Sequence, residues 1–156
     1  MGWWSAYTHP VAGDVNIAAM ENCVCFNLRW LSRAITQYFV NELGHHGLLP
    51  TQTPILAALA GRPGATMSEL SDWLGMDRTT LVRNLGPLER DGWVQASGKG
   101  RGNKVTLALT PKGRTALGKF FPDWQRAQAK VLATLGEARW KEILSDLERA
   151  ALALQK

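Results

Sequence analysis

The chain has 156 residues, of which 46% are hydrophobic and 20% charged, with a formal net charge of +5. This composition is ordinary for a globular protein, and the length suits one compact domain. No stretch is long and apolar enough to cross a membrane, and no Lys or Arg precedes Arg29, so the charged start of a secretory signal is missing. Two cysteines give no disulfide framework, and we expect a cytoplasmic protein.

The first part of the chain predicts a long helix and then a shorter one. From Ile17 to Leu43, apolar residues recur every three or four positions, which is typical of a helix with one buried face. Thr51 is expected to cap a second helix that runs through Leu59. Pro54 then lies in the first turn, where a proline costs little.

A helix-turn-helix is predicted over residues 66–92. Ser68 is expected to cap the first helix, Gly75 to end it, and Asp77 to cap the second. Leucines follow Asp77 at i, i+4 and i+7 spacing, which predicts one buried face. The apolar faces consist of Leu70, Trp73 and Leu74 in the first helix and Leu81, Leu85 and Leu88 in the second. A short helix, a tight turn and a longer helix form the arrangement that places one helix in a DNA groove.

The opposite face of the second helix carries side chains that hydrogen-bond phosphates and base edges. These residues are Arg78, Thr79, Thr80, Arg83 and Asn84. We expect Arg83 and Thr79 to contact base edges, while Ser68 and Thr80 contact phosphates.

A two-stranded hairpin is predicted next, over residues 93–96 and 105–109. Its tip contains three glycines and the cations Lys99, Arg101 and Lys104, which attract a phosphate backbone. Thr110 and Pro111 then open another helix, as a cap followed by proline at the first helical position.

Positive charge is concentrated around this hairpin. Residues 92–122 contain six basic residues and no Asp or Glu, whereas the first 65 residues hold three of each sign. A solvated charged surface is the ordinary reason for such a bias. We favour nucleic-acid binding, because the charge coincides with an element that needs it.

The remaining helices are expected to form a dimerisation frame. Apolar side chains continue along residues 111–155, where Pro122 is expected to kink the helix and a last helix starts at Glu137. Together with residues 17–44, these helices would expose a large apolar patch in a monomer, so we expect a second copy to cover it. The alternative is that the helices close on the domain itself.

The sequence resembles the MarR family of winged-helix transcription regulators. The resemblance is carried by SELSDWLGM, DRTTLVRNL, LERDGWV and LTPKGR, in that order, and extends from about Asn22 to Leu147. It implies a mainly α fold with a small β-hairpin wing, in which residues 51–110 form a winged helix-turn-helix DNA-binding unit between the frame helices. It also implies a homodimer on a pseudo-palindromic operator of double-stranded DNA, usually repressing transcription until an effector lowers its affinity.

One departure from the family concerns the wing. Many members carry Asp-Arg-Arg there, and the Asp orients an Arg that enters the minor groove. The corresponding residues in this chain are Arg101-Gly102-Asn103. The acid is missing, and Arg101 is the candidate for a minor-groove contact, with Lys99 and Lys104 as phosphate partners.

Cys25 lies in Cys-Phe-Asn-Leu, which resembles the reactive-cysteine sequence of the family branch that senses organic hydroperoxides. Arg29, four residues on, stands where that branch usually has a tyrosine, and a nearby cation helps stabilise a thiolate. We favour the alternative that Cys23 and Cys25 are small buried hydrophobic residues. On a helix they point to different sides and should not pair with each other.

Family members bind small aromatic acids and similar ligands between the frame and the DNA unit. The resemblance therefore suggests an effector space lined by Trp30, His46 and Phe121. Adjacent His45 and His46 lack the i, i+4 spacing of helical metal ligands, so we expect no metal and no cofactor.

Two other function classes compete with a DNA-binding repressor. An enzyme would use Cys25 as nucleophile and His45 or His46 as base, but the sequence has no motif for an orienting group or an oxyanion site. A winged-helix protein-interaction module would show no salt-dependent affinity for duplex DNA, whereas a repressor would lose affinity steeply as salt rises.

Overall fold

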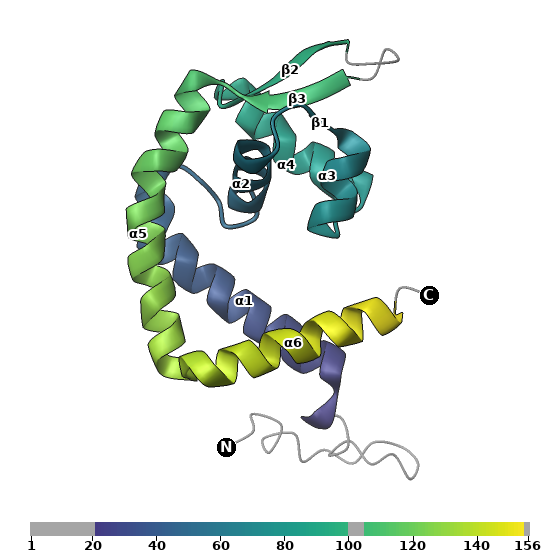
Figure 1. Cartoon of the computed structure of the whole chain (residues 1–156). Helices are drawn as coiled ribbons and strands as arrows, with labels where there is room; N and C mark the ends of the chain where they lie inside the picture. Colours follow the sequence, from purple (N-terminus) through teal and green to yellow (C-terminus); the bar gives the residue numbers. More distant parts are fainter. Residues whose placement is uncertain (1–20, 100–104, 155–156) are drawn as a thin grey trace, which may run out of the picture. The chain divides into compact units, whose positions relative to one another are not determined.

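The structure is a computed structural model, and it describes residues 21–99 and 105–154 (Figure 1). The chain divides between Tyr38 and Phe39 into two compact units. Within the described ranges, no helix combines the length and the apolar character needed to span a bilayer.

Helix α1 spans Val24–Leu43, so it begins seven residues later than the apolar pattern from Ile17 predicted. Residues 17–20 lie outside the described part, and Glu21–Cys23 precede the helix. The side-chain amide of Asn27 donates to the carbonyls of Glu21 at 2.8 Å and Cys23 at 2.9 Å. Since a continuing helix would bond the Glu21 carbonyl to the Cys25 N–H, this side-chain contact favours a start at Val24.

The second unit begins with the end of α1, where Phe39 and Leu43 are buried. The short 3₁₀ helix η3 (Gly44–His46) follows, and then α2 (Thr53–Gly61). The prediction that Thr51 caps α2 was wrong: Gln52 occupies the N-cap position, and its side chain accepts a 3.0 Å bond from the Leu49 N–H. Pro54 lies in the first turn of α2, as predicted.

Helices α3 (Met67–Leu74) and α4 (Arg78–Arg90) form the predicted helix-turn-helix. Ser68 does not cap α3. Thr66 is the N-cap, and it forms a capping box with Glu69, because the glutamate lies three residues after Thr66. Gly75 ends α3 in the left-handed conformation, with φ 58°.

Three antiparallel strands pack beside these helices in the order β1-β3-β2 (Figure 1). The hairpin strands β2 (Val94–Lys99) and β3 (Val105–Leu109) were predicted, although β2 continues three residues further. Strand β1 (Ala65–Thr66) was not predicted, and it pairs Ala65 with Leu107.

The core of this unit lies between the sheet and helices α2 to α5. Its fully or almost fully buried side chains are Leu43, Leu48, Ile55, Leu56, Leu59, Leu70, Leu81, Leu85, Leu88, Val94, Leu107, Leu109 and Phe120. The leucines at i, i+4 and i+7 of α4 are among them, which confirms the predicted buried face. Trp73, predicted to be apolar core, is 41% exposed. Its ring is covered by the Arg62 guanidinium at 4.3 Å instead.

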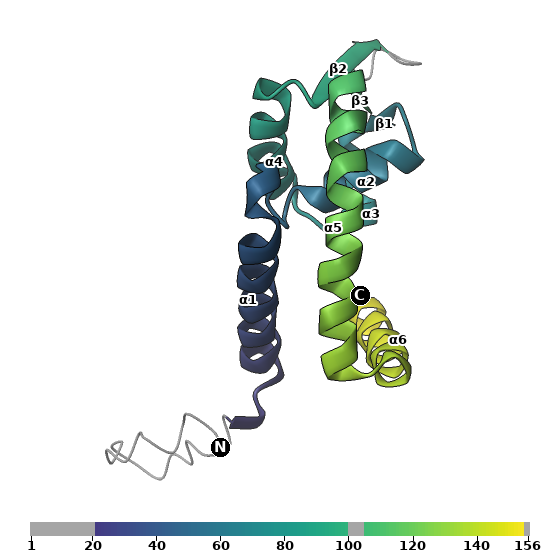
Figure 2. The same cartoon turned by 90° about the vertical axis from the view of Figure 1, so that its left-hand side faces the viewer.

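Two helices complete the unit. Helix α5 (Pro111–Leu135) runs as one helix through Pro122, and α6 (Glu137–Leu154) leaves its end crosswise after Gly136, so that Figure 2 shows α6 nearly end-on. No side chain of α6 is buried within the described residues.

Candidate DNA-binding surface

Asp77 fixes the start of α4. One carboxylate oxygen accepts from the Thr80 N–H at 2.8 Å, and the other from the Thr80 hydroxyl at 2.7 Å. These bonds hold the pKa of Asp77 below its usual range, because they stabilise the ionised form. The negative charge also suits the positive end of the helix dipole. The N-terminal turn of α4, which is the part that a recognition helix presents to bases, is therefore firmly defined.

The two faces of α4 divide as the sequence predicted. Leu81, Leu85 and Leu88 are buried, while Arg78, Thr79 and Arg83 are exposed. Three polar side chains are thus available to a ligand on the outer face. Ser68, at the second position of α3, is also exposed.

Thr80 and Asn84 are engaged within α4. The hydroxyl hydrogen of Thr80 is donated to Asp77, so it is not available to a phosphate in the free protein. The Asn84 amide donates to the Thr80 carbonyl at 2.9 Å, which leaves its second N–H and its oxygen for another partner. In the N-terminal half of α4, the accessible donors are mainly those of Arg78, Thr79 and Arg83.

The wing projects from the same unit. Its strands pair from Val94 opposite Leu109 to Lys99 opposite Val105, with a register irregularity between Ser97 and Lys99. Arg101, Lys104 and the side chain of Lys99 lie outside the described residues. Their assignment to DNA contacts stays a prediction.

The base of the wing is held to the start of α5. The Thr110 hydroxyl donates to the Gly92 carbonyl at 2.7 Å, and the Thr110 N–H donates to the Trp93 carbonyl at 3.0 Å. Lys112 and Arg114 donate to the carbonyls of Asp91 and Leu109, at 2.7 Å and 3.1 Å. Lys112 and Arg114 belong to the basic cluster of residues 92–122 that indicated DNA binding, and they also stabilise this junction.

An apolar cavity of about 320 Å³ lies between the segment from Phe39 to Ala57 and α5. Its lining residues are Phe39, Leu43, Leu48, Pro50, Thr53, Pro54, Ala57, Leu117, Phe120, Phe121, Trp124 and Gln128. The rings of Phe121 and Trp124 stack at 5.6 Å between centroids. Among these described lining residues, Thr53 and Gln128 are the only ones with polar side chains apart from the Trp124 indole N–H, and none is Lys, Arg or His.

The three residues predicted to line one effector space do not line the same cavity. Phe121 lines the apolar cavity. His46 does not; it borders a second, more open hollow together with Trp93, Lys112 and Lys119. Trp30 belongs to the other unit, is 53% exposed and is not among the lining residues. The lining residues of α2 and α5 belong to an apolar helical pattern in the sequence. Such a pattern alone does not distinguish a packed core from the wall of a cavity.

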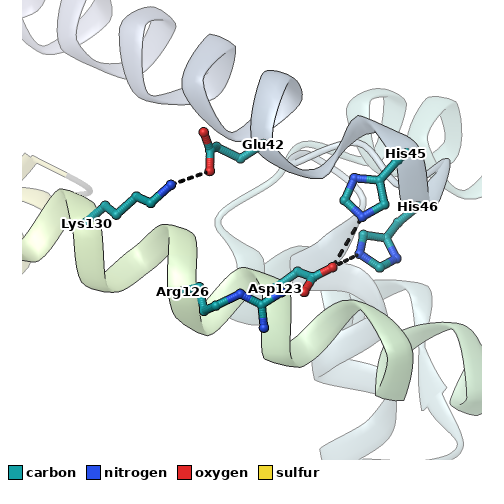
Figure 3. A network of polar contacts seen from close by, with 6 residues as sticks. All are labelled: Glu42, His45, His46, Asp123, Arg126 and Lys130. Carbon is teal, nitrogen blue, oxygen red and sulfur yellow. Dashed lines mark hydrogen bonds and ion pairs between the residues drawn. The ribbon is translucent and has the colours of Figure 1, made fainter.

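A polar cluster joins η3 to α5 (Figure 3). One carboxylate oxygen of Asp123 bonds the Nε2 atoms of His45 at 3.2 Å and His46 at 2.8 Å, and the other bonds Arg126. The pKa of Asp123 lies below its usual range, mainly because of the His46 bond, then His45 and the Arg126 charge. Lys130 and Glu42 form a further ion pair at 2.9 Å. No sequence motif connects Asp123 with the histidines, which lie 77 and 78 residues away.

Cys25 is exposed in the first turn of α1, and Cys23 is partly exposed just before the helix. The prediction that both are buried was therefore wrong for the described chain. Among the described residues of α1, the buried ones are Phe39 and Leu43, at the other end of the helix from Cys25.

Comparison with known proteins agrees with this geometry. The sequence model of the MarR family matches residues 46–101, which contain α2, the helix-turn-helix and the first wing strand. Among curated proteins the comparison found no relative.

Solved structures of transcriptional regulators match nearly the whole chain. The M. tuberculosis transcriptional regulator MosR is 37% identical with a TM-score of 0.74, and the match covers 86% of this chain and 98% of MosR. MosR in complex with DNA is 36% identical, with a TM-score of 0.76 over 86% and 100% of the two chains. The PcaV regulator from Streptomyces coelicolor, in complex with its natural ligand, has the same fold at 21% identity and a TM-score of 0.76, covering 94% and 100%. The chain thus belongs to the MarR family of transcriptional regulators.

Proposed function

We propose that the protein is a homodimeric, sequence-specific repressor that is released from its operator by a small aromatic ligand. The observation that carries this proposal is the exposed face of α4, where Arg78, Thr79 and Arg83 extend from a helix that Asp77 caps, in a chain of the MarR family. The MosR structure with DNA supports DNA as the partner.

A second copy of the chain accounts for the uncovered apolar residues of the terminal helices. The exposed large apolar side chains there are Val24, Leu28, Trp30 and Leu31 in α1, Phe121 in α5, and Leu144, Leu147, Leu152 and Leu154 in α6. Leaving so many in water is costly, and residues 17–44 and 111–155 would bury them against their counterparts. A twofold dimer also suits a pseudo-palindromic site.

In the dimer, two copies of α4 would enter successive major grooves, about 34 Å apart. Arg83 and Thr79 would contact base edges, with Arg83 able to address guanine through two hydrogen bonds. Ser68, Arg78 and Asn84 would contact the backbone or neighbouring bases, and Thr80 would do so only after releasing Asp77. Lys99, Arg101 and Lys104 of the wing tip would supply charge to the adjacent backbone and minor groove.

The effector would occupy the apolar cavity. A volume of about 320 Å³ accommodates one aromatic ring with a short substituent, and Phe121 and Trp124 offer it a stacking surface. The Gln128 amide can bond a polar group of the ligand, and the Thr53 hydroxyl, which donates to the Leu49 carbonyl at 3.2 Å, can accept from one. Because none of the described lining residues carries a positive charge, a neutral, phenol-like ligand suits the cavity better than a carboxylate does.

In-vitro selection of bound duplexes tests the function, followed by sedimentation of the protein with the selected DNA. The proposal expects a pseudo-palindromic consensus, two protomers per duplex, and an affinity that falls steeply with salt. A monomer on DNA, or no enrichment of any sequence at low salt, would contradict it. A phenol series added to the complex then tests release.

A second candidate, favoured by the exposure of Cys25, is a repressor that senses peroxide through this thiol. Mild treatment with an organic hydroperoxide, followed by mass spectrometry, should then modify Cys25 and lower DNA affinity, and Cys25→Ser should abolish both effects. An unmodified Cys25 with intact DNA binding rejects this candidate.

The solved relatives described above are transcriptional regulators, and we assign no enzymatic activity to this chain. As a DNA-binding regulator, the protein would act in the cytoplasm. The winged-helix protein-interaction module is the alternative that an absence of salt-dependent DNA binding would favour.

A further inference from the structure

The polar cluster between η3 and α5 contains three side chains that ligate metals. One ring nitrogen of His45, one of His46 and a carboxylate oxygen of Asp123 all lie within 4.8 Å of one another. Both imidazoles point at the same carboxylate oxygen (Figure 3). Three potential ligand atoms from two separate segments therefore converge on one point.

We propose that His45, His46 and Asp123 form a binding site for a divalent transition metal of the Zn²⁺ class. Zn²⁺ binds imidazole nitrogen and carboxylate oxygen at about 2.0–2.2 Å, so tetrahedral ligands lie about 3.3 Å from each other. The imidazole–carboxylate distances here are 3.2 and 2.8 Å. Those two contacts need to lengthen by a few tenths of an ångström to admit the ion, and the ligating nitrogens of the two histidines, which lie within 4.8 Å of each other, need to approach by side-chain rotation.

The ligand set selects the metal. Two imidazoles and one carboxylate suit Zn²⁺, Co²⁺ or Ni²⁺, whereas Mg²⁺ and Ca²⁺ prefer sites built of oxygen atoms. With three protein ligands, the fourth position is left for water or a small anionic ligand. To coordinate through Nε2, each neutral imidazole carries its proton on Nδ1 instead.

The surroundings of the three residues hold the ligands in place, but nearby positive charges limit the affinity for a metal ion. The side chain of His46 is 14% exposed and that of Asp123 24%, and the His46 ring packs edge-on against Phe120 at 5.5 Å. Arg126 bonds the second oxygen of Asp123 and orients the carboxylate. Its charge, with that of Lys119 at the adjacent hollow, opposes a dication. These two cations favour a site of moderate affinity.

Metal binding to the purified full-length protein tests the proposal in two ways. Competition with a chromophoric chelator measures Zn²⁺ affinity and stoichiometry, and Co²⁺ substitution reports tetrahedral coordination through intense visible absorption. We expect one ion per chain. His46→Ala and Asp123→Asn should each lower the affinity at least tenfold and abolish the Co²⁺ spectrum.

Three controls isolate the site. His9→Ala removes the third histidine of the sequence, and a Cys23→Ser/Cys25→Ser variant removes both thiols; neither should change the affinity. His45→Ala alters a side chain that is 61% exposed, so it should fold even if His46→Ala does not, and it should also weaken binding.

The proposal is overturned if the protein retains no Zn²⁺ or Co²⁺ against the chelator, if His45→Ala and Asp123→Asn bind as the wild type does, or if the cysteine variant loses the ion. DNA binding measured on metal-free protein is a separate readout, so failure here leaves the proposed repressor function intact.

Discussion

Gly113 offers the sharpest test of how the wing is attached to α5. It is buried in the first turn of α5, and a Cβ at this position would lie 2.9 Å from the Trp93 carbonyl carbon and closer still to its oxygen. That oxygen also accepts the Thr110 N–H at 3.0 Å. Gly113→Ala must therefore displace backbone that holds the base of the wing.

The magnitude follows from three contributions. Overpacking against an atom that cannot rotate away costs about 1–3 kcal/mol. Weakening the bond from Thr110 adds about 1 kcal/mol. Alanine in place of glycine in a helix returns about 0.5–1 kcal/mol. We expect Gly113→Ala to lower the free energy of unfolding by about 2 kcal/mol.

Gly118→Ala is the matched control, because Gly118 lies in the same helix and a Cβ there meets no atom within 4 Å. It should gain about 0.5–1 kcal/mol from helix propensity alone. Urea denaturation, followed by circular dichroism at equal protomer concentration, measures both variants. If Gly113→Ala proves as stable as Gly118→Ala, the close approach of Trp93 to α5 is wrong.

Three further predictions concern the capping residues and the cavity. Thr66→Ala removes the capping box with Glu69 and should cost about 1 kcal/mol of stability in urea denaturation; an unchanged midpoint would contradict the role of Thr66. The lowered pKa of Asp77 means that its ionised form stabilises the fold above the usual value of 3.8, and that this contribution is lost as pH falls through the lower folded pKa. The stability advantage of the wild type over Asp77→Asn should therefore shrink as pH is lowered below about 4, and a constant difference would refute this. Ala57→Phe should fill the apolar cavity, abolishing calorimetric binding of phenol-like ligands while leaving DNA affinity unchanged; retained ligand binding would place the effector elsewhere.

Local chemistry made much of the fold predictable. Asp77 and Thr110 cap their helices as expected. A side-chain oxygen directly before an apolar helical pattern lies where it can accept from the free N–H groups of the first turn. Ser68 was the wrong choice for α3 since Thr66, two residues earlier, is the residue with a glutamate three positions on. The three-residue spacing of Thr66 and Glu69 is therefore a capping signal that the sequence contains.

Contacts between distant segments were not predictable in the same way. Strand β1 has two residues and exists through its pairing with β3, about 40 residues later, so it leaves no alternation to detect. Likewise, nothing near Asp123 in sequence indicates His45 or His46. The close approach of Gly113 to Trp93 also depends on how α5 leaves the sheet, although both residues belong to motifs that the family resemblance had marked.

The outer face of α4 was predictable, but the use of its side chains was only partly so. Because a buried leucine stands at every third or fourth position of α4, helix geometry alone leaves Arg78, Thr79 and Arg83 exposed. The engagement of Thr80 by Asp77 depends on rotamers that periodicity does not specify.

The central claim is that α4 recognises base sequence, and the Arg83→Ala variant tests it most directly. The matched control is Arg90→Ala, which removes the same charge from an exposed residue in the last turn of α4. Fluorescence anisotropy would measure both variants on the selected operator and on a scrambled duplex across a range of salt. We predict that Arg83→Ala loses about 1–3 kcal/mol on the operator and far less on the scrambled duplex, while Arg90→Ala affects both duplexes weakly and alike. Equal losses for the two variants, or an Arg83→Ala protein that still discriminates between the duplexes as the wild type does, would contradict this account.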